Sequence, residues 1–333
     1  MRVLSLFDII PSSQLDNMLV VKSPAPEYPA DFSGGFILVN TKDVPSSNLF
    51  TISVGTSLND QTHFKKFLYN KGSGTDFLGF DNGFRSLKGG INAVLSPMNN
   101  GYDLLNNGLN NDWTVKDRRP LADLSLNMNF SRRWVDSSGR TLAILGTVNY
   151  SNSYRTYLDM DNNLFGAYDM THDCSNYLRK SIDDQYNHNV RIGTMLNFTY
   201  VPASGNSRYE FKNIFNQLGK DRYTYRKGTD AQSDYEESAE YYYQSRTTYN
   251  GQFTGKHTLG DADKLDWSTG YSYANRNMPD RRRYTTVLNE ETNQLEVENL
   301  NEINREFSRL DEHICRLTSI ISTISLSGFL LLA

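Results

Sequence analysis

The sequence predicts an all-β protein: an antiparallel meander of about eight strands that forms part of a larger transmembrane β-barrel. Three observations lead to this fold class: strict alternation of apolar and polar residues, a regular succession of short turns and long polar connections, and low hydrophobicity. Hydrophobic residues make up 38% of the chain and the mean hydropathy is −0.58. These values exclude a helical membrane protein, whereas in a barrel only every second strand residue faces lipid.

The alternation is clearest in the segment from Asp123 to Ser131. Its apolar positions are Leu124, Leu126, Met128 and Phe130. Successive side chains of a strand point to opposite faces, so we expect these four on the convex, lipid-facing side and Asn127 and Asn129 on the concave side. A strand of a soluble β-sandwich would alternate in the same way, and this segment alone does not separate the two.

The spacing of turns favours the barrel. Short turns are expected at 135–139, 203–207 and 259–263, each between two alternating segments. The strands predicted around the first two turns are 121–134, 141–154, 185–200 and 208–219, and further strands flank the third turn. Long polar connections are expected at 155–183, 220–237 and 278–306. Outer-membrane barrels combine short turns at one rim with long loops at the other, whereas sandwich domains rarely do so.

The first 120 residues have a different character. A strand is expected at 49–57, followed by an irregular stretch at 58–120 on the rim of the long loops, with a short helix near 101–110. No export signal is recognised, because Asp8 interrupts the short apolar run near the start. The two cysteines, Cys174 and Cys315, are expected to be free thiols, although a disulfide stays open.

Residues 15–43 resemble the end of the plug domain of TonB-dependent outer-membrane receptors. In that family an apolar strand ending in Val-x-Lys-(Ser/Gly)-Pro leads to Gly-Gly and then to a strand that closes on Thr-Lys. The matching positions here are Val20, Lys22, Ser23, Pro24, Gly34, Gly35, Thr41 and Lys42. Independently of the family, two adjacent glycines permit positive φ or close backbone approach, and the pair alone would equally fit a bulged turn.

The resemblance implies three parts: a remnant of the plug domain at 1–45, the N-terminal part of the barrel at 46–315, and an atypical apolar tail at 316–333. Receptor barrels of this family have about 22 strands and a longer plug. We therefore expect a receptor fragment that is inactive alone, with a frameshift near Cys315 as an explanation of the tail.

The resemblance also implies a function. The intact receptor is expected in the cell outer membrane, surrounded by lipid, importing a large, scarce solute while the TonB energy-coupling complex remodels its plug. The alternative is a non-transporting outer-membrane barrel or surface binding protein, such as a porin or an adhesin, which has no reason to carry segment 15–43. Siderophore, cobalamin and glycan receptors all combine a plug domain with such a barrel, so the resemblance leaves the class of ligand open.

No catalytic, cofactor-binding or metal-binding residues are expected, and we predict that the chain is not an enzyme. The formal charge of −4 gives no electrostatic basis for binding nucleic acid. His172, Asp173 and Cys174 are interpreted as polar residues of an outer loop, with a metal site as the alternative. Arg281–Arg283 is interpreted as a solvated charge run in another loop, with binding to anionic lipopolysaccharide as the alternative.

Two further patterns resemble known motifs without completing them. The start of an EF-hand calcium loop is matched by the spacing of Asp159, Asp161 and Asn163. The loop also requires a Gly and a Glu, and here Leu164 and Met170 occupy those positions. The run 71–75 lacks the Gly-Lys-Ser/Thr ending of a phosphate-binding loop and is interpreted as a flexible loop.

Overall fold

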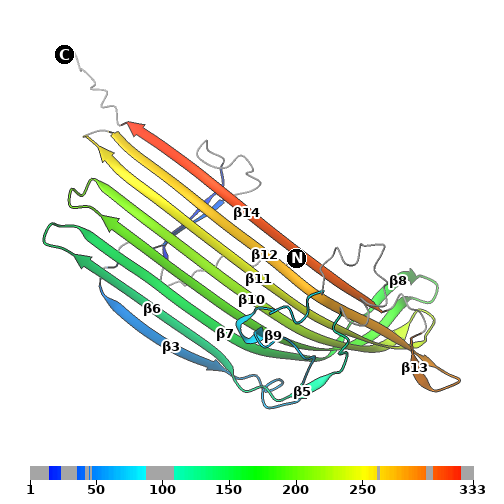
Figure 1. The fold of residues 1–333 in the computed structure, drawn as a ribbon. Helices are drawn as coiled ribbons and strands as arrows, with labels where there is room; N and C mark the ends of the chain where they lie inside the picture. The colour runs from blue at the N-terminus through cyan, green and yellow to red at the C-terminus, as the bar shows by residue number, and fades with distance from the viewer. Residues whose placement is uncertain are drawn as a thin grey trace, which may run out of the picture.

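The computed structural model describes residues 15–23, 36–41, 45, 47–87, 109–260, 263–297 and 303–323. Ten strands in these ranges form one antiparallel sheet, and eight of them are long and follow one another in sequence order (Figure 1). The long strands are β3 (Leu49–Ser57), β6 (Asp123–Val135), β7 (Thr141–Asp161), β9 (Cys174–Val201), β10 (Ser207–Asp230), β11 (Tyr235–Leu259), β12 (Asp263–Asn289) and β14 (Asn304–Thr323). The predicted all-β meander is confirmed.

Smaller elements surround this sheet. β8 (Leu164–Asp169) pairs with β9, and β13 (Gln294–Glu296) pairs with β12. β1 (Leu15–Val21) and β2 (Phe36–Thr41) form a separate antiparallel pair, as do β4 (Phe67–Tyr69) and β5 (Lys116–Arg118). Within the described residues, a 3₁₀ turn, η3, spans Asp76–Leu78. The helix expected near 101–110 lies almost wholly outside the described residues. No helix in the described ranges has the length and apolar character needed to cross a membrane.

Strand pairing places the alternating apolar residues of neighbouring strands on one face of the sheet. One row across the strands illustrates this: Val54 lies opposite Leu126, Leu126 opposite Tyr150, and Tyr150 opposite Ile192. Paired residues of antiparallel strands point to the same side, so Leu124, Met128 and Phe130 share this face and Asn127 and Asn129 take the other. The predicted division of β6 into an apolar and a polar face is therefore observed.

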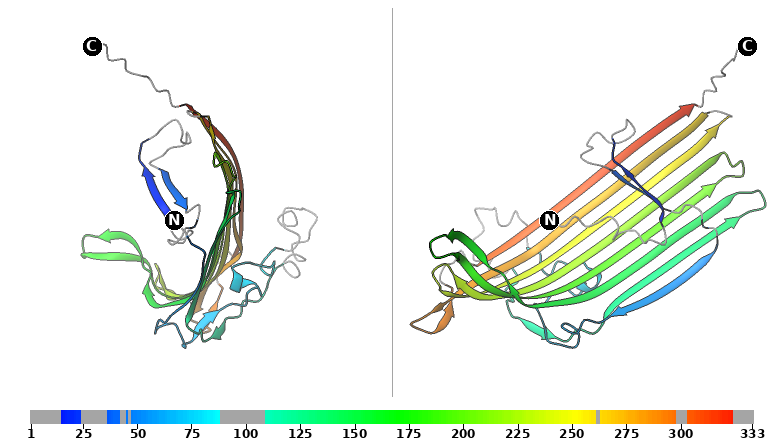
Figure 2. Two further views of the ribbon diagram at one scale, coloured as in Figure 1. Left: turned by 90° about the vertical axis from the view of Figure 1, so that its left-hand side faces the viewer. Right: turned by 180° about the vertical axis from the view of Figure 1, so that it is seen from behind.

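The sheet is curved, and its two faces carry different elements. Seen from its side, it bows away from β1 and β2, which lie on the concave side, while β4 and β5 lie on the convex side (Figure 2). The Tyr150 hydroxyl donates a hydrogen bond of 2.9 Å to the Phe77 carbonyl of η3, so the apolar face is the convex one. Within the described residues β3 pairs only with β6 and β14 only with β12, so the sheet is open and does not close into a barrel.

The predicted strand ends near the short turns are accurate, but the predicted long connections are wrong in extent. β7 continues to Asp161, β10 ends at Asp230, and β11 begins at Tyr235, so the connections shrink to 162–173, 231–234 and 290–303. Beyond the apolar band the strands carry polar and aromatic residues on both faces. The hydropathy alternation therefore fades while backbone pairing continues. β14 likewise runs past Cys315 to Thr323, into the segment expected to be an atypical tail.

Residues 58–87 and 109–120, here called the covering segment, pack on the convex face near the rim of the longer connections. Phe67 is 1% exposed and meets Tyr154 and Tyr186 edge to face, with ring centroids 5.4 and 5.5 Å apart. Trp113 meets Tyr241 in the same way at 5.8 Å. The described parts of the irregular stretch thus lie towards the rim opposite the short turns, as the sequence predicted.

The covering segment is fixed by an ion-pair centre and by a close backbone contact. The Arg85 guanidinium binds Asp76 at 2.6 Å and Asp81 at 2.9 Å, and lies 4.0 Å from the Tyr243 ring centroid. Gly79 has φ +78° and lies against Gly219 of β10, so closely that a Cβ on Gly219 would lie 2.5 Å from the Gly79 Cα. Only a glycine at position 219 allows this approach.

We expect Gly219→Ala to lift the covering segment from the sheet, because the added methyl group meets backbone that cannot rotate away. The free energy of unfolding in a urea titration should fall by about 1–3 kcal/mol, and amide hydrogen exchange of residues 58–87 should accelerate. Gly270→Ala is the matched control, because its Cβ would have its nearest neighbour at 3.6 Å. Equal effects of the two substitutions would contradict the contact.

Candidate functional site

The motif residues that suggested a plug domain lie in and beside β1 and β2. Val20 pairs with Ile37 and is 52% exposed, and Thr41 ends β2 opposite Leu15. Lys22 and Ser23 follow β1 at the other end of the pair. Pro24, Gly34, Gly35 and Lys42 lie outside the described residues. The described motif residues thus belong to an antiparallel pair of strands.

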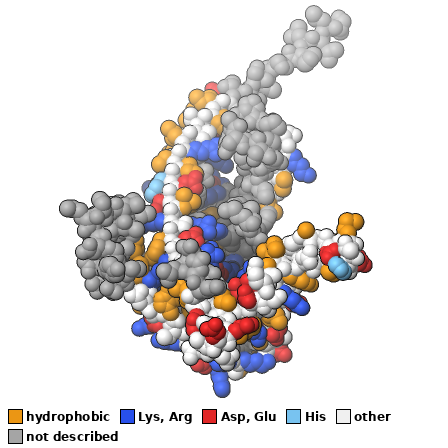
Figure 3. All heavy atoms as spheres, turned by 90° about the vertical axis from the view of Figure 1, so that its right-hand side faces the viewer, with side chains coloured by type: hydrophobic (Ala, Val, Ile, Leu, Met, Phe, Trp, Pro, Cys, Tyr) orange, Lys and Arg blue, Asp and Glu red, His pale blue; other side chains and the backbone are white. Residues whose placement is uncertain are grey.

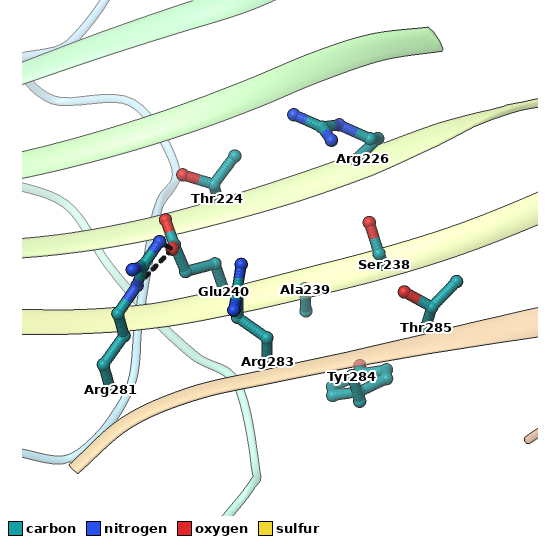
Figure 4. A pocket seen from close by; sticks show the side chains of 9 residues that line it. All are labelled: Thr224, Arg226, Ser238, Ala239, Glu240, Arg281, Arg283, Tyr284 and Thr285. Atoms are coloured by element: carbon teal, nitrogen blue, oxygen red, sulfur yellow. Dashed lines mark hydrogen bonds and ion pairs between the residues drawn. The ribbon is translucent and has the colours of Figure 1, made fainter. Parts of the chain in front are cut away.

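Charged side chains line the concave face along β10, β11 and β12. Two hollows follow one another there. The first has a volume of about 310 Å³ and is lined by Arg226, Glu240, Arg281 and Arg283 together with small polar side chains (Figure 4). The second, of about 590 Å³, lies closer to the short turns and includes Lys220, Tyr242 and Arg246. Even-numbered residues of β10 and β11 line both hollows because alternate residues share a face.

Glu240 is the centre of the first hollow. Its carboxylate binds Arg222 of β10 at 2.5 Å and also pairs with Arg281 of β12, whose Nε donates at 2.7 Å. Burial alone would raise the pKa of the Glu240 carboxyl, but the charges of Arg222 and Arg281 outweigh burial and hold its pKa below the ordinary value. Arg281 also reaches Glu306 of β14 at 3.2 Å. One carboxylate therefore joins three neighbouring strands.

Asp183 of β9 forms a comparable ion pair with Arg226 of β10. The guanidinium donates two hydrogen bonds to this carboxylate, of 2.7 and 2.8 Å, and the Asn162 amide adds a third of 2.7 Å. Burial opposes ionisation of Asp183, yet these donors lower its pKa below the ordinary value. The cations Arg222, Arg226 and Arg281 around the first hollow are thus each matched by a carboxylate.

The second hollow has a different charge balance. Its lining contains three cations, Arg191, Lys220 and Arg246, and no carboxylate. The side chains of Lys220 and Arg246 make no ion pair or hydrogen bond with any residue that the structure describes. Burial and the nearby Arg222 lower the pKa of Lys220. The hydroxyls of Ser151 and Ser153 complete one wall. This arrangement offers positive charge and hydrogen-bond donors to an anionic molecule.

The charge run Arg281–Arg283 is strand and not outer loop, which corrects the expectation from the sequence. Its members alternate between faces: Arg281 and Arg283 line the first hollow, while Arg282 is 4% exposed on the convex side. There its guanidinium lies 5.0 Å from the Trp113 ring centroid and donates to the Asp112 carbonyl at 2.7 Å. Arg281 and Arg283 thus contact the concave hollow, while Arg282 contacts the covering segment on the convex face. The alternation of side chains along a strand could have suggested this division.

The other candidates from the sequence remain without a site. His172 bonds Asp169 at 2.7 Å at the tip of the hairpin made by β8 and β9, which projects from the sheet with exposed apolar side chains (Figure 3). Cys174 and Cys315 are free thiols, as expected. Asp159 lies in the left-handed region at φ 53°. In the parts of the chain that are described, no three His, Cys, Asp or Glu side chains come together as metal ligands.

Comparisons with protein-family models, with curated proteins and with solved structures find no match to this chain.

We expect Glu240→Gln to lower the free energy of unfolding at pH 7 by roughly 1.5–3 kcal/mol, because two arginines lose their anionic partner. The pKa of Glu240 is lowered in the folded protein. Its contribution to stability is therefore present above the pKa of the unfolded chain and is lost as the pH falls through the folded value. Urea titrations should show wild type and variant converging as the pH falls below the ordinary pKa of a glutamate carboxyl.

Glu306→Gln is the matched control, since this carboxyl is 48% exposed and touches only the far side of Arg281. Its effect should stay below about 0.5–1 kcal/mol. A stability difference between wild type and Glu240→Gln that does not change with pH would contradict the ionic role of Glu240.

Proposed function

We propose that this chain forms part of the wall of an outer-membrane β-barrel of the TonB-dependent receptor class, which imports a large solute across the outer membrane. The observation that carries the proposal is the two-sided sheet: apolar side chains alternate onto the convex face of β3, β6, β7 and β9, opposite a concave face on which charged side chains line β10, β11 and β12. A barrel wall with lipid outside and an aqueous or protein-filled lumen needs this division.

The exposure of the convex face supports a lipid environment. Large apolar side chains are exposed on several strands of this face, including Ile52 of β3 at 53%, Leu142 of β7 at 42% and Phe211 of β10 at 42%. Soluble monomers rarely leave so extended an apolar surface uncovered. A tilted strand crosses the hydrocarbon core with about 9–11 residues, while β9 alone has 28. The strands are therefore long enough to extend beyond the bilayer, where the ion-paired hollows and the covering segment would lie.

The concave face has two features that favour contact with a plug domain. Near the short turns it is a packing surface, on which Ala143, Leu145 and Met195 are 1%, 4% and 3% exposed. β1 and β2, which carry the plug-like motif, lie on this side of the sheet (Figure 2). A passive porin would instead present an open, polar lumen wall here. These two features favour a gated importer over the porin or adhesin alternative.

The two edge strands of the sheet need hydrogen-bonding partners when the protein lies in a bilayer. β3 and β14 each have one unpaired side in the described sheet, and each unpaired backbone group in hydrocarbon costs on the order of several kcal/mol. We propose that in the bilayer both edges pair with further strands.

We expect Ile52→Arg to destabilise the protein by about 2–4 kcal/mol in lipid vesicles, because the charge faces hydrocarbon. Ser53→Arg is the matched control: it is the next residue on the same strand, also exposed, but on the opposite face. Urea titrations in vesicles should separate the two variants. Equal, small effects would place both faces in water and contradict a membrane wall.

The importing function is tested in cells. Deletion of the gene that encodes this chain should abolish accumulation of a solute, and an uncoupler of the proton motive force should have the same effect on wild-type cells. Accumulation that depends on the gene but resists the uncoupler would contradict energy-coupled import and favour a passive porin.

A further inference from the structure

Near its start, the covering segment exposes an aromatic side chain. Phe64 is 58% exposed and has φ +62°, a left-handed backbone conformation that a bulky residue rarely adopts. Such strain persists only where the surrounding structure fixes the backbone, and it is concentrated at functional positions. A strained turn therefore holds this aromatic ring outwards, which points to a role in contact with another surface.

The backbone around Phe64 is fixed by hydrogen bonds to the sheet. The Thr62 hydroxyl accepts a backbone N–H of β7 at 2.9 Å, and the His63 Nε2 bonds the carboxylate of Asp123, at the start of β6, at 2.9 Å. The N–H of Phe64 itself donates to the Pro120 carbonyl at 2.9 Å. The position of the ring is therefore set by β6 and β7.

Two further apolar side chains lie beside this turn. Leu58 directly follows β3 and is 67% exposed, and Leu121 shortly precedes β6 and is 73% exposed. Ser57 pairs with Asp123, so the chain leaves both strands at the same place. Single exposed apolar residues are ordinary, but here three surround one rigid turn. Phe64, Leu58 and Leu121 are here called the apolar edge.

The apolar edge continues the apolar band of the convex face. Along β6 the convex positions from Leu124 to Trp134 are apolar except for Arg132. A tilted strand crosses the hydrocarbon core with about 9–11 residues, and this span matches that length. Leu124, opposite Thr56, thus marks the boundary of the band. The apolar edge follows directly beyond it, at the level of the lipid headgroups.

The residues next to the apolar edge fit the polar side of such a boundary. Lys65 and Lys66 follow Phe64, and both are exposed. Lysine side chains near a bilayer bury their apolar stems and keep their ammonium groups in the headgroup region. Segments that lie in a membrane interface combine inserted Phe or Leu side chains with neighbouring lysines in this way.

From these observations we infer that the covering segment rests on the outer leaflet of the membrane, with Phe64, Leu58 and Leu121 inserted at the boundary between acyl chains and headgroups. The partner is therefore a lipid surface. The inference rests on the proposed membrane wall, because the rim of the longer connections is the outer one in such barrels. The contact keeps the covering segment on the convex face and sets the height of the wall in the bilayer.

Spin labels on the full chain test the inference in vesicles of phosphatidylethanolamine and phosphatidylglycerol, in a background without Cys174 and Cys315. Phe64→Cys carries the label in one variant and Phe165→Cys in the matched control. Phe165 is 55% exposed, but it lies on β8, which projects on the concave side (Figure 2). At position 64 we expect oxygen to reach the label more readily than a water-soluble nickel complex does, and the reverse at position 165. Leu121→Cys should resemble Phe64→Cys.

A second variant removes the ring and keeps the turn. Phe64→Asn suits this purpose, because Asn adopts the left-handed conformation far more readily than Phe. In a chain labelled at Leu121→Cys, it should shift the label from oxygen access towards nickel access. Phe165→Asn is the matched control and should leave that label unchanged, and circular dichroism checks that both variants are folded. An unchanged signal in Phe64→Asn would contradict insertion of the ring.

Two results at position 64 would overturn the inference: nickel access as high as at position 165, or shielding from both reagents, as when a second copy of the chain or another protein covers the ring. Labels at Leu126 and Met128 of β6 report separately on the proposed wall. Lipid contact at β6 without lipid contact at position 64 would remove the inference alone. Lipid contact at position 64 without lipid contact at β6 would leave a peripheral membrane contact and remove the wall proposal.

Discussion

The register between strands is the constraint on which the rest of the structure depends. β10 pairs with β9 and with β11 over their whole shared length without a shift. Because side chains alternate with a period of two, a slip of one residue would exchange the faces of an entire strand. With the register fixed, the alternating apolar residues of β3 and β6 point to the convex side. The same register collects the cations of three strands on the concave side.

The register breaks only at the far half of the sheet. Between the long strands, the shifts lie between Tyr157 and Met160, between Tyr241 and Ser245, and between Met278 and Arg281. Bulges bend a strand and redirect its side chains, and these three occur where the covering segment and the first hollow lie. The regular half thus serves as a two-faced wall, while the irregular half brings Arg281 towards Glu240 and Arg282 towards Trp113. These ion-pair and aromatic contacts therefore lie beside the register shifts.

The sequence predicts the regular half well and the irregular half poorly, for a physical reason. Near the short turns one face is apolar, so Leu124, Leu126 and their neighbours reveal strand, face and turn together. Beyond the apolar band both faces are polar, so the hydropathy signal vanishes although the strands continue.

The concave hollows were missed for the same reason. Glu240 and Arg281 are 41 residues apart and become neighbours only through pairing of β11 with β12. The charge run Arg281–Arg283 therefore resembled a solvated loop. The plug-like motif stays a prediction, since half of its positions lie outside the described residues.

The central claim is that the convex face contacts lipid while the concave face does not. Spin labels placed singly at residues 124–130 of β6, in a background without Cys174 and Cys315, measure this directly in vesicles. Power-saturation spectra should show oxygen accessibility rising at Leu124, Leu126, Met128 and Phe130 and falling at the residues between them. Accessibility without a period of two, or high access of a water-soluble nickel complex on both faces, would contradict the account.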